Sequence, residues 1–251
     1  MTGKIAYRTM ASSVLESLQK NPAMCPYDNH LSPTRPVYFA VTMVIVIFVL
    51  GCGRQTADQR ELSNAIRAAK TESADGRKEI YLWEKQIDDE DLRQLASLTE
   101  LHSLAIPHAR NVTNASMEVI ANIPGLRNLD LAGTGINNEG LEPLRNHPTL
   151  TRLVVNETRV TDAGLAIIAT IPNLEVLELY RCRVTDEGLR HIGRMRNLVR
   201  ISLDSTPVTD RGLVHLYPLQ NLRRLQVGDT HVTASGINAF QRRRPDLTIT
   251  N

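Results

Sequence analysis

Three consecutive stretches decide the fold: LTRLVVNETRVTDAGLAIIATIPN (150–173), LEVLELYRCRVTDEGLRHIGRMRN (174–197) and LVRISLDSTPVTDRGLVHLYPLQN (198–221). They align without gaps, and leucine, isoleucine or valine recurs at the same positions in each. A fixed period of this length indicates a solenoid of stacked coils. The pattern extends in both directions, so that about seven 24-residue repeats fill residues 77–245, the second being one residue longer. The units begin at Arg77, Leu101, Leu126, Leu150, Leu174, Leu198 and Leu222.

Each unit opens with an alternation of apolar and polar residues, as around Leu177 and Leu179, which predicts a strand with one side turned inward. A small polar residue such as Thr206 follows, and we expect it to satisfy buried backbone groups of the loop. Thr185-Asp186 and its equivalents predict a helix start, because threonine is a good N-cap and aspartate suits the positive helix end. A glycine recurs two residues later, which suggests close packing between coils. The aliphatic layers explain an aromatic content of only 4%.

The Thr-Asp-x-Gly-Leu units resemble the cysteine-containing and ribonuclease-inhibitor-like classes of leucine-rich repeat. The resemblance implies an α/β fold, a right-handed horseshoe arc with a parallel sheet on its concave face. The two ends depart from the pattern, as the ends of solenoids do. Asp88-Asp89 replaces Thr-Asp in the first unit, while Leu247 and Ile249 predict a last short strand. The run Arg242–Arg244 predicts a polar C-terminal cap, and its alternative interpretation is a patch for a membrane surface or an anionic partner.

The N-terminal region contains an uncharged stretch, VYFAVTMVIVIFVL (37–50), with Arg35 just before it. This stretch is shorter than the ~20 apolar residues of a membrane span, but it fits the apolar core of a secretory signal peptide. The sequence VLGC (49–52) at its end resembles a bacterial lipobox. That resemblance implies that Cys52 becomes the lipidated first residue of the mature protein. We therefore expect residues 1–51 to be a signal region.

The whole chain resembles bacterial leucine-rich-repeat lipoproteins, which implies a place in the cell envelope, anchored to a membrane and periplasmic or surface-exposed. Gly53, not aspartate, follows Cys52, so the resemblance favours the outer membrane. The alternative is an uncleaved signal anchor in which Cys52 carries no lipid. Residues 1–36 are long for the front of a signal peptide, and we expect translation to start later, at a methionine such as Met10 or Met24.

Two further segments complete the expected domain organisation. Residues 52–76 are polar and predict a tether that holds the repeats away from the membrane. Leu62, Ile66 and Ala69 fall on one side at helical spacing, so this tether predicts a short helix ending near Lys70. Residues 77–251 are expected to form the leucine-rich-repeat domain with its C-terminal cap.

Composition and motifs exclude several classes of function. A net charge of +2 is too small to indicate nucleic acid. The sequence has no CxxC, HExxH, Walker-type or GxSxG motif, so we predict no catalytic residues, cofactor or metal, and a protein that is not an enzyme. His191 and His215 share a repeat position and could share a metal, but no third ligand is apparent. Three cysteines are too few for a disulfide framework, and Cys182 is expected to be buried and structural.

The third, fifth and seventh residues of each unit are expected to point outward on the concave face, which solenoids use for partners. Tryptophan, tyrosine and arginine dominate interface hot spots. We therefore predict a partner-binding surface there, with Tyr81 and Trp83 at its far end. The alternative is that these two rings only cover the edge of the sheet and that the rest is a solvated face. The other predicted residues are Arg152, Glu178, Tyr180, Arg200, Asp204 and Arg224.

These observations predict a non-enzymatic protein–protein interaction module with an unidentified protein partner. Similar repeats serve as substrate-recognition arms of F-box ubiquitin-ligase adaptors, so an arm of a larger complex is the alternative. No F-box-like helical domain is evident before Arg77, which makes that role the weaker expectation.

Overall fold

The computed structural model describes residues 55–70, 78–83 and 86–251, with side chains described over 59–66 in the first of these ranges. The expected signal region, the lipobox and Cys52 lie outside the described residues. Within the described part of the chain, no helix is long and apolar enough to cross a membrane.

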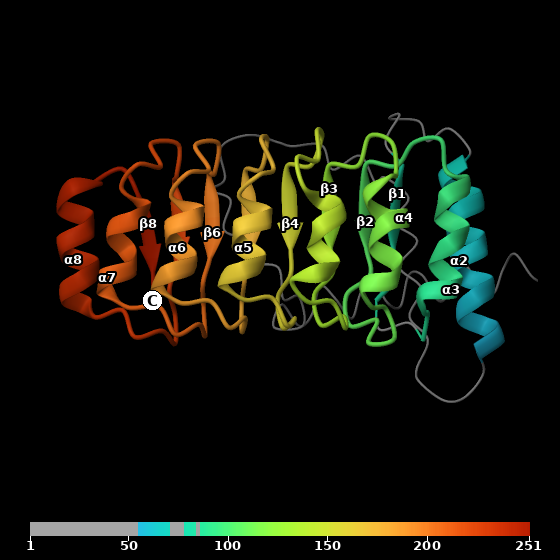
Figure 1. Cartoon of the computed structure of the whole chain (residues 1–251), viewed down its shortest axis with the longest axis horizontal. Helices are drawn as coiled ribbons and strands as arrows, with labels where there is room; N and C mark the ends of the chain where they lie inside the picture. The colour runs from blue at the N-terminus through green and yellow to red at the C-terminus, as the bar shows by residue number, and fades with distance from the viewer. Residues whose placement is uncertain (1–54, 71–77, 84–85) are drawn as a thin grey trace, which may run out of the picture. The chain divides into compact units, whose positions relative to one another are not determined.

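Eight parallel strands form one open sheet and follow each other in sequence order (Figure 1). Neighbouring strands pair with a step of 24 residues, except that Leu104 pairs with Leu129 after the one-residue extension of the second unit. The predicted final strand is present and pairs with the strand before it through Leu225 and Ile249. The strands are β1 (Glu79–Tyr81), β2 (Ser103–Ala105), β3 (Asn128–Asp130), β4 (Arg152–Val154), β5 (Val176–Glu178), β6 (Arg200–Ser202), β7 (Arg224–Gln226) and β8 (Thr248–Thr250).

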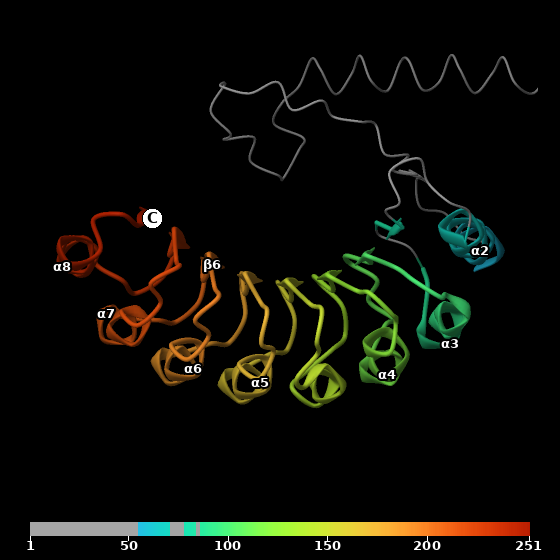
Figure 2. The ribbon, with the colours of Figure 1, turned by 90° about the horizontal axis from the view of Figure 1, so that it is seen from above.

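Short helices connect the strands, and Figure 2 shows the coils following an arc with strands on the inner side and helices on the outer side. The α/β leucine-rich-repeat arc predicted from the sequence is therefore confirmed. The α-helices are α2 (Gln55–Lys70), α3 (Asp89–Leu92), α4 (Met117–Ala121), α5 (Asp162–Ile168), α6 (Asp186–Ile192), α7 (Asp210–Leu213) and α8 (Ala234–Arg243). The 3₁₀ helices are η2 (Arg93–Ser97), η3 (Asn114–Ser116), η4 (Glu139–Leu144) and η5 (Val214–Leu216).

The core between sheet and helices is a stack of aliphatic layers. Leu153, Leu177, Ile201 and Leu225 are fully buried at equivalent positions of four coils. The small polar residues that end the strands also behave as predicted: Thr206 Oγ1, for example, donates to the carbonyl oxygen of Leu203 at 2.5 Å. Inward groups of this kind remove the cost of burying loop carbonyls without partners.

The aspartates that open the helices link neighbouring coils. Oδ1 of Asp186 accepts from the backbone N–H of Thr209 at 2.8 Å, and its Oδ2 accepts from Thr209 Oγ1 at 2.7 Å. Asp162 holds Thr185 in the same way, and Asp210 holds Thr233. We call this series the Asp–Thr ladder. The sequence predicted that these aspartates act on the ends of their own helices, but their main hydrogen-bond partner is the threonine of the next coil. Asn138 with Thr161 and Asp89 with Thr113 form the corresponding rungs toward the N-terminal end.

The recurring glycine leaves room for this ladder. A Cβ atom at Gly212 would collide with the carboxylate of Asp186 and lie 2.8 Å from Cδ1 of Leu189. Gly188 lies in the same way against Asp162 and Leu165 of the preceding coil. The close packing predicted from the recurrence is therefore present, and its cause is the aspartate of the coil before.

Helix α2 covers the N-terminal end of the core. Leu62, Ala65 and Ile66 are buried in the same hydrophobic cluster as the repeats, and Ser63 Oγ donates to Oε1 of Gln94 at 3.0 Å. The apolar side predicted for this helix is thus the side that packs. The helix lies within the segment expected to be a tether, and it closes a layer of core that has no preceding coil.

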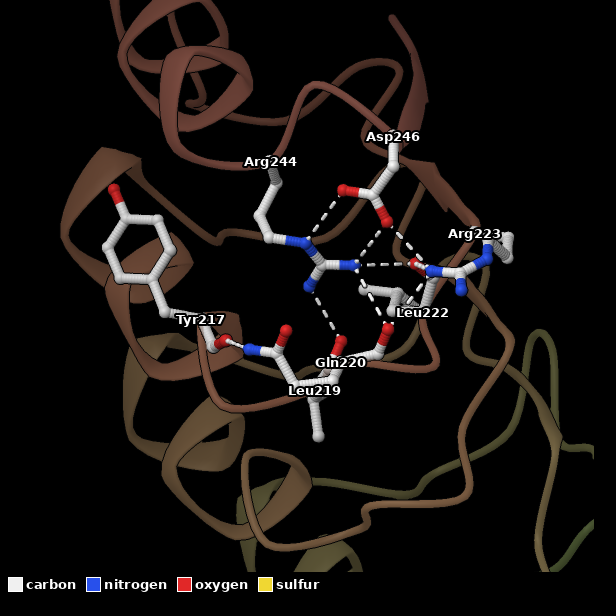
Figure 3. Close-up of polar contacts among 7 residues, drawn as sticks. All are labelled: Tyr217, Leu219, Gln220, Leu222, Arg223, Arg244 and Asp246. Carbon is white, nitrogen blue, oxygen red and sulfur yellow. Dashed lines mark hydrogen bonds and ion pairs between the residues drawn. The ribbon is translucent and has the colours of Figure 1, made fainter.

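At the opposite end, the run Arg242–Arg244 divides between surface and interior. Arg244 is only 6% exposed, and its guanidinium donates to the carbonyl oxygens of Leu219 at 2.6 Å and Leu222 at 2.9 Å (Figure 3). Asp246 accepts from Nε of the same guanidinium at 3.1 Å, and this bond together with nearby arginines lowers the pKa of the Asp246 carboxyl. Arg244 therefore caps the last loop, and Arg242 and Arg243 are the members of the run that remain exposed.

Candidate binding surface

The concave sheet surface consists of the two outward residues of each strand and of the residue two positions after the end of that strand. The parallel register sets these residues in rows about 4.8 Å apart from strand to strand. One row contains Arg152, Val176, Arg200 and Arg224. The six predicted residues between Arg152 and Arg224 therefore come together on β4–β7 and the loops directly after them.

Glu178 forms an ion pair with Arg152 within this surface. Nη2 of Arg152 donates to Oε1 of Glu178 at 2.6 Å, and the two side chains are 25% and 18% exposed. Nδ2 of Asn156 donates to Oε2 of the same carboxylate at 3.3 Å. A half-buried ion pair with an additional hydrogen bond is fixed in geometry, so the charge of Glu178 is used within the sheet.

Asp204 is also committed to neighbours within the sheet. Its Oδ1 accepts from the backbone N–H of Gly228 at 2.6 Å, and its Oδ2 accepts from Ser202 Oγ at 3.0 Å. Burial raises the pKa of the Asp204 carboxyl above its ordinary value, and the charges of Asp229 and Glu178 add to this, although the two hydrogen bonds oppose it. The carboxylate thus pays a desolvation cost in order to hold the start of the next loop.

Arg200 and Arg224, which we call the arginine pair, are partners in the register of β6 and β7. Among the described residues, neither guanidinium forms a hydrogen bond or an ion pair. Burial lowers the pKa of Arg200, and the positive charges of Arg224 and Arg152 lower it further, against a smaller opposing effect of Glu178. The two positive charges therefore repel each other, and Arg200 is in addition partly desolvated, whereas Arg224 is exposed.

Tyr180 lies two residues after the end of β5, and its ring contacts a residue that the sequence analysis did not single out. The guanidinium carbon of Arg181 lies 4.9 Å from the centre of the Tyr180 ring, and Nη1 of Arg181 is 3.4 Å from Oε1 of Glu157. The backbone N–H of Tyr180 donates to Oδ1 of Asn156 at 2.7 Å. A cation over an aromatic face stabilises the ring orientation. The sequence signal that could have identified Arg181 is its position directly after an outward-facing tyrosine.

Tyr81 and Trp83 are not brought to the arginine pair. They lie on and directly after β1. This strand is three strands from β4, the nearest strand of the surface that contains the arginine pair, and that separation is about 14 Å at the usual strand spacing. Their ring centres are 6.3 Å apart, and the ring of Trp83 lies 5.3 Å from that of His108. They form a separate aromatic cluster at the N-terminal end, and His108 is a member that sequence reasoning missed.

Four outward positions are buried although the alternation predicted exposure: Ala105, Pro107, Val154 and Ser202. Their side chains are short and stand between longer neighbours on an inward-curving sheet. The usable part of the surface is therefore narrower than the sequence pattern implied. It consists mainly of the long side chains in the row from Arg152 to Arg224, together with Tyr180.

The other sequence candidates are structural or isolated. Cys182 is buried, its Sγ donates to the carbonyl oxygen of Val155 at 3.1 Å, and burial raises the pKa of its thiol. A protonated, buried thiol is unreactive. For His191 and His215, no third ligand comes near: the described residues contain no group of three or more side chains able to hold a metal ion.

Comparison with known proteins agrees with this geometry. A family model described as Leucine Rich repeat matches residues 126–144 and 170–193. Internalin C2 from Listeria monocytogenes is 20% identical with a TM-score of 0.51, over 75% of this chain and 92% of that one. A leucine-rich-repeat protein of Leptospira interrogans is 18% identical with a TM-score of 0.43, over 64% of this chain and 51% of that one, so the chain spans about half of its length. No curated protein matches the sequence.

The family match over these two stretches, the parallel sheet and the repeated coils define the fold class as a leucine-rich-repeat solenoid. The likeness to internalin C2 concerns the fold alone, because the identity is low. Proteins of this class are in general binding modules that use an extended concave surface.

Proposed function

We propose that this chain is a non-enzymatic protein-interaction module that binds a protein partner on the concave sheet surface between β4 and β7. The observation that carries the proposal is the arginine pair, because two guanidinium groups on adjacent strands, one of them partly buried, lack partners within the described protein. Charges left in that state cost stability, and a partner that pairs with them recovers the cost. Tyr180, four residues after the register partner of Arg200, adds to the same surface an aromatic side chain of the kind that dominates interfaces.

A crosslinking experiment in cells tests the position of the binding surface. A photoreactive amino acid replaces Gln226 on the concave side or, as a matched control, Val214, which is 48% exposed on the helical side. We expect a discrete protein adduct from position 226 that disappears with Tyr180→Ala plus Arg200→Ala. Equal adducts from position 214, or an adduct that survives both substitutions, would contradict this proposal.

We further propose that the mature protein is anchored in the cell envelope through a lipid on Cys52, with the repeats facing the periplasm or the cell surface. The lipobox-like sequence supports this, as does the start of α2 at Gln55, only a few residues later. Cys52→Ala should abolish metabolic labelling with a fatty-acid analogue, while Cys25→Ala should leave it unchanged. Persistent labelling of the Cys52 variant would exclude that residue as the lipid site and favour an uncleaved signal anchor, which the mass of the mature chain would then show.

A further inference from the structure

We propose that the arginine pair is a recognition site for carboxylates, and that the partner of this protein presents an acidic segment to Arg200 and Arg224. The inference rests on the proposed function and adds to it the chemistry of the partner. Its basis is an imbalance of pairing on the concave sheet surface: the acidic side chains nearby are already bound, and the two basic ones are not.

The acids of this surface are poorly placed to neutralise the pair from within. Glu178 is held by Arg152 and by Asn156, and Asp204 is held by Ser202 and by the backbone N–H of Gly228. Turning either carboxylate toward Arg200 would break two contacts in order to make one. Since a buried group that loses its partner costs more than a new surface pair returns, the pairing seen here is the stable one.

Two arginines on the helical side of the arc are paired within their own helices. Arg190 is paired with Glu187 one helical turn away, and Arg145 is paired with Glu142 in the same way. These side chains are well exposed, where an ion pair contributes little. Arg200 is partly buried and faces the like charge of Arg224, so it would benefit more from a partner, and it has none among the described residues. That distribution favours a ligand that arrives from outside.

Carboxylates on a polypeptide fit this site better than a small phosphate ligand. Arginine binds carboxylates through two parallel hydrogen bonds, and two guanidinium groups on adjacent strands can engage neighbouring acids of one extended segment. The surface here is an open sheet face whose backbone N–H groups are used in strand pairing, so it lacks the cradle of amides that phosphate sites use. Tyr180, four residues beyond this row on the same surface, offers additional contact area to a partner that extends along the strands.

The test uses the full-length protein in detergent and a fluorescently labelled oligoglutamate peptide as probe. We expect saturable binding by fluorescence anisotropy that weakens with NaCl, and no binding of an oligolysine peptide of equal length. Arg200→Gln plus Arg224→Gln should weaken binding at least about tenfold. The matched control is Arg190→Gln plus Arg211→Gln, which makes the same change in charge on helices α6 and α7 and should leave affinity within about twofold. Arg200→Lys plus Arg224→Lys should bind with intermediate affinity.

Three results would overturn the proposal. The first is equal binding by the concave double variant and the control variant, which would mean that only net charge matters. The second is no binding of oligoglutamate to the folded protein. The third is binding of inorganic phosphate, and not of oligoglutamate, with the same arginine dependence, which would make this a phosphate site. Thermal unfolding of every variant checks its folding. An adduct from position 226 that persists when Arg200 and Arg224 are replaced, but disappears with Tyr180→Ala plus Arg200→Ala, would support the concave binding surface and contradict the acidic partner.

Discussion

Two series of polar residues cross this solenoid from coil to coil, and they differ in one respect. In the Asp–Thr ladder, a side chain such as Asp186 receives both a backbone N–H and a hydroxyl from the next coil. On the concave sheet surface, Arg152 is paired with Glu178, whereas Arg200 and Arg224 have no partner among the described residues. The ladder repeats with the period of the fold, and the concave row does not.

The difference separates stability from recognition. A contact that recurs in every coil adds the same favourable interface between repeats, and the stability of a solenoid is close to the sum of such terms. A row that changes from coil to coil adds no regular term, and it leaves charges that only an external group can satisfy. Substitutions in the ladder and its caps should therefore lower the free energy of unfolding, and substitutions in the concave row should change binding far more than stability.

The largest loss is expected where the repetition ends and one residue must replace a missing coil. Arg244→Ala removes a buried guanidinium and its hydrogen bonds to the carbonyl oxygens of Leu219 and Leu222, which keep only the N–H of Leu222 and a longer bond from Arg223. We expect the free energy of unfolding to fall by about 3 kcal/mol, because a hydrogen bond to a charged group contributes about 1.5–3 kcal/mol. Urea denaturation measures this. Arg242→Ala, on the exposed side of α8, is the control and should change the free energy of unfolding by less than about 0.5 kcal/mol.

A glycine of the ladder should come next. Gly212→Ala places a methyl group against the carboxylate of Asp186 and against Leu189. Overpacking of this kind costs about 1–3 kcal/mol, and it outweighs the gain of up to about 1 kcal/mol that alanine brings to a helix. We expect a net loss of about 2 kcal/mol by the same denaturation experiment, and less than about 0.5 kcal/mol for the adjacent exposed control Arg211→Ala. A stabilised Gly212→Ala variant would show that the coils can move apart freely.

A single rung of the ladder should be worth somewhat less. Asp186→Ala removes two hydrogen bonds to Thr209, and we expect a loss of about 1–2 kcal/mol. Asp186→Asn should recover most of it, since Asn138 already does this work for Thr161 with 2.9 Å bonds from both its oxygen and its nitrogen. If the asparagine variant were as unstable as the alanine variant, the negative charge itself would be the stabilising element.

The fold could be predicted from the sequence because each strand and helix start is fixed by residues within one unit. The period, the strand positions around Leu177 and the last strand at Ile249 all follow from local alternation and spacing. The role of Asp186 could not be found in this way, since its main partner lies 23 residues away in the next coil. A local interpretation of that aspartate sees only its own helix.

The candidate surface was predicted in outline and not in its pairing. The alternation correctly gathers Arg152, Arg200 and Arg224 in one row. It gives no sign that the first binds Glu178 while the other two are left over, because that outcome depends on rotamers and burial. Ser202 shows the same limit: its position is outward, but it is buried and serves as a hydrogen-bond donor to Asp204.

The smallest expected effect has the opposite sign and sharpens the contrast between the two series. Asp204→Asn keeps an oxygen that can accept from the backbone N–H of Gly228 and removes a charge that burial disfavours. Asn156, at the equivalent position two coils earlier, already accepts from the backbone N–H of Tyr180 in this way. Because folding raises the pKa of Asp204 above 3.8, the folded state binds more protons than the unfolded state as the pH rises through that range. Wild-type stability should therefore fall from this group as the carboxyl ionises. The asparagine variant should be more stable at neutral pH by less than about 1 kcal/mol, and the advantage should vanish below the ordinary aspartate pKa. Urea denaturation at neutral pH and at a pH below the ordinary aspartate pKa measures this difference in stability. Asp186→Asn is the control and should show no such gain. A loss of stability at neutral pH would mean that the charge of Asp204 strengthens the bond to Gly228 more than burial weakens it, and the concave row would then contain a stabilising rung of its own.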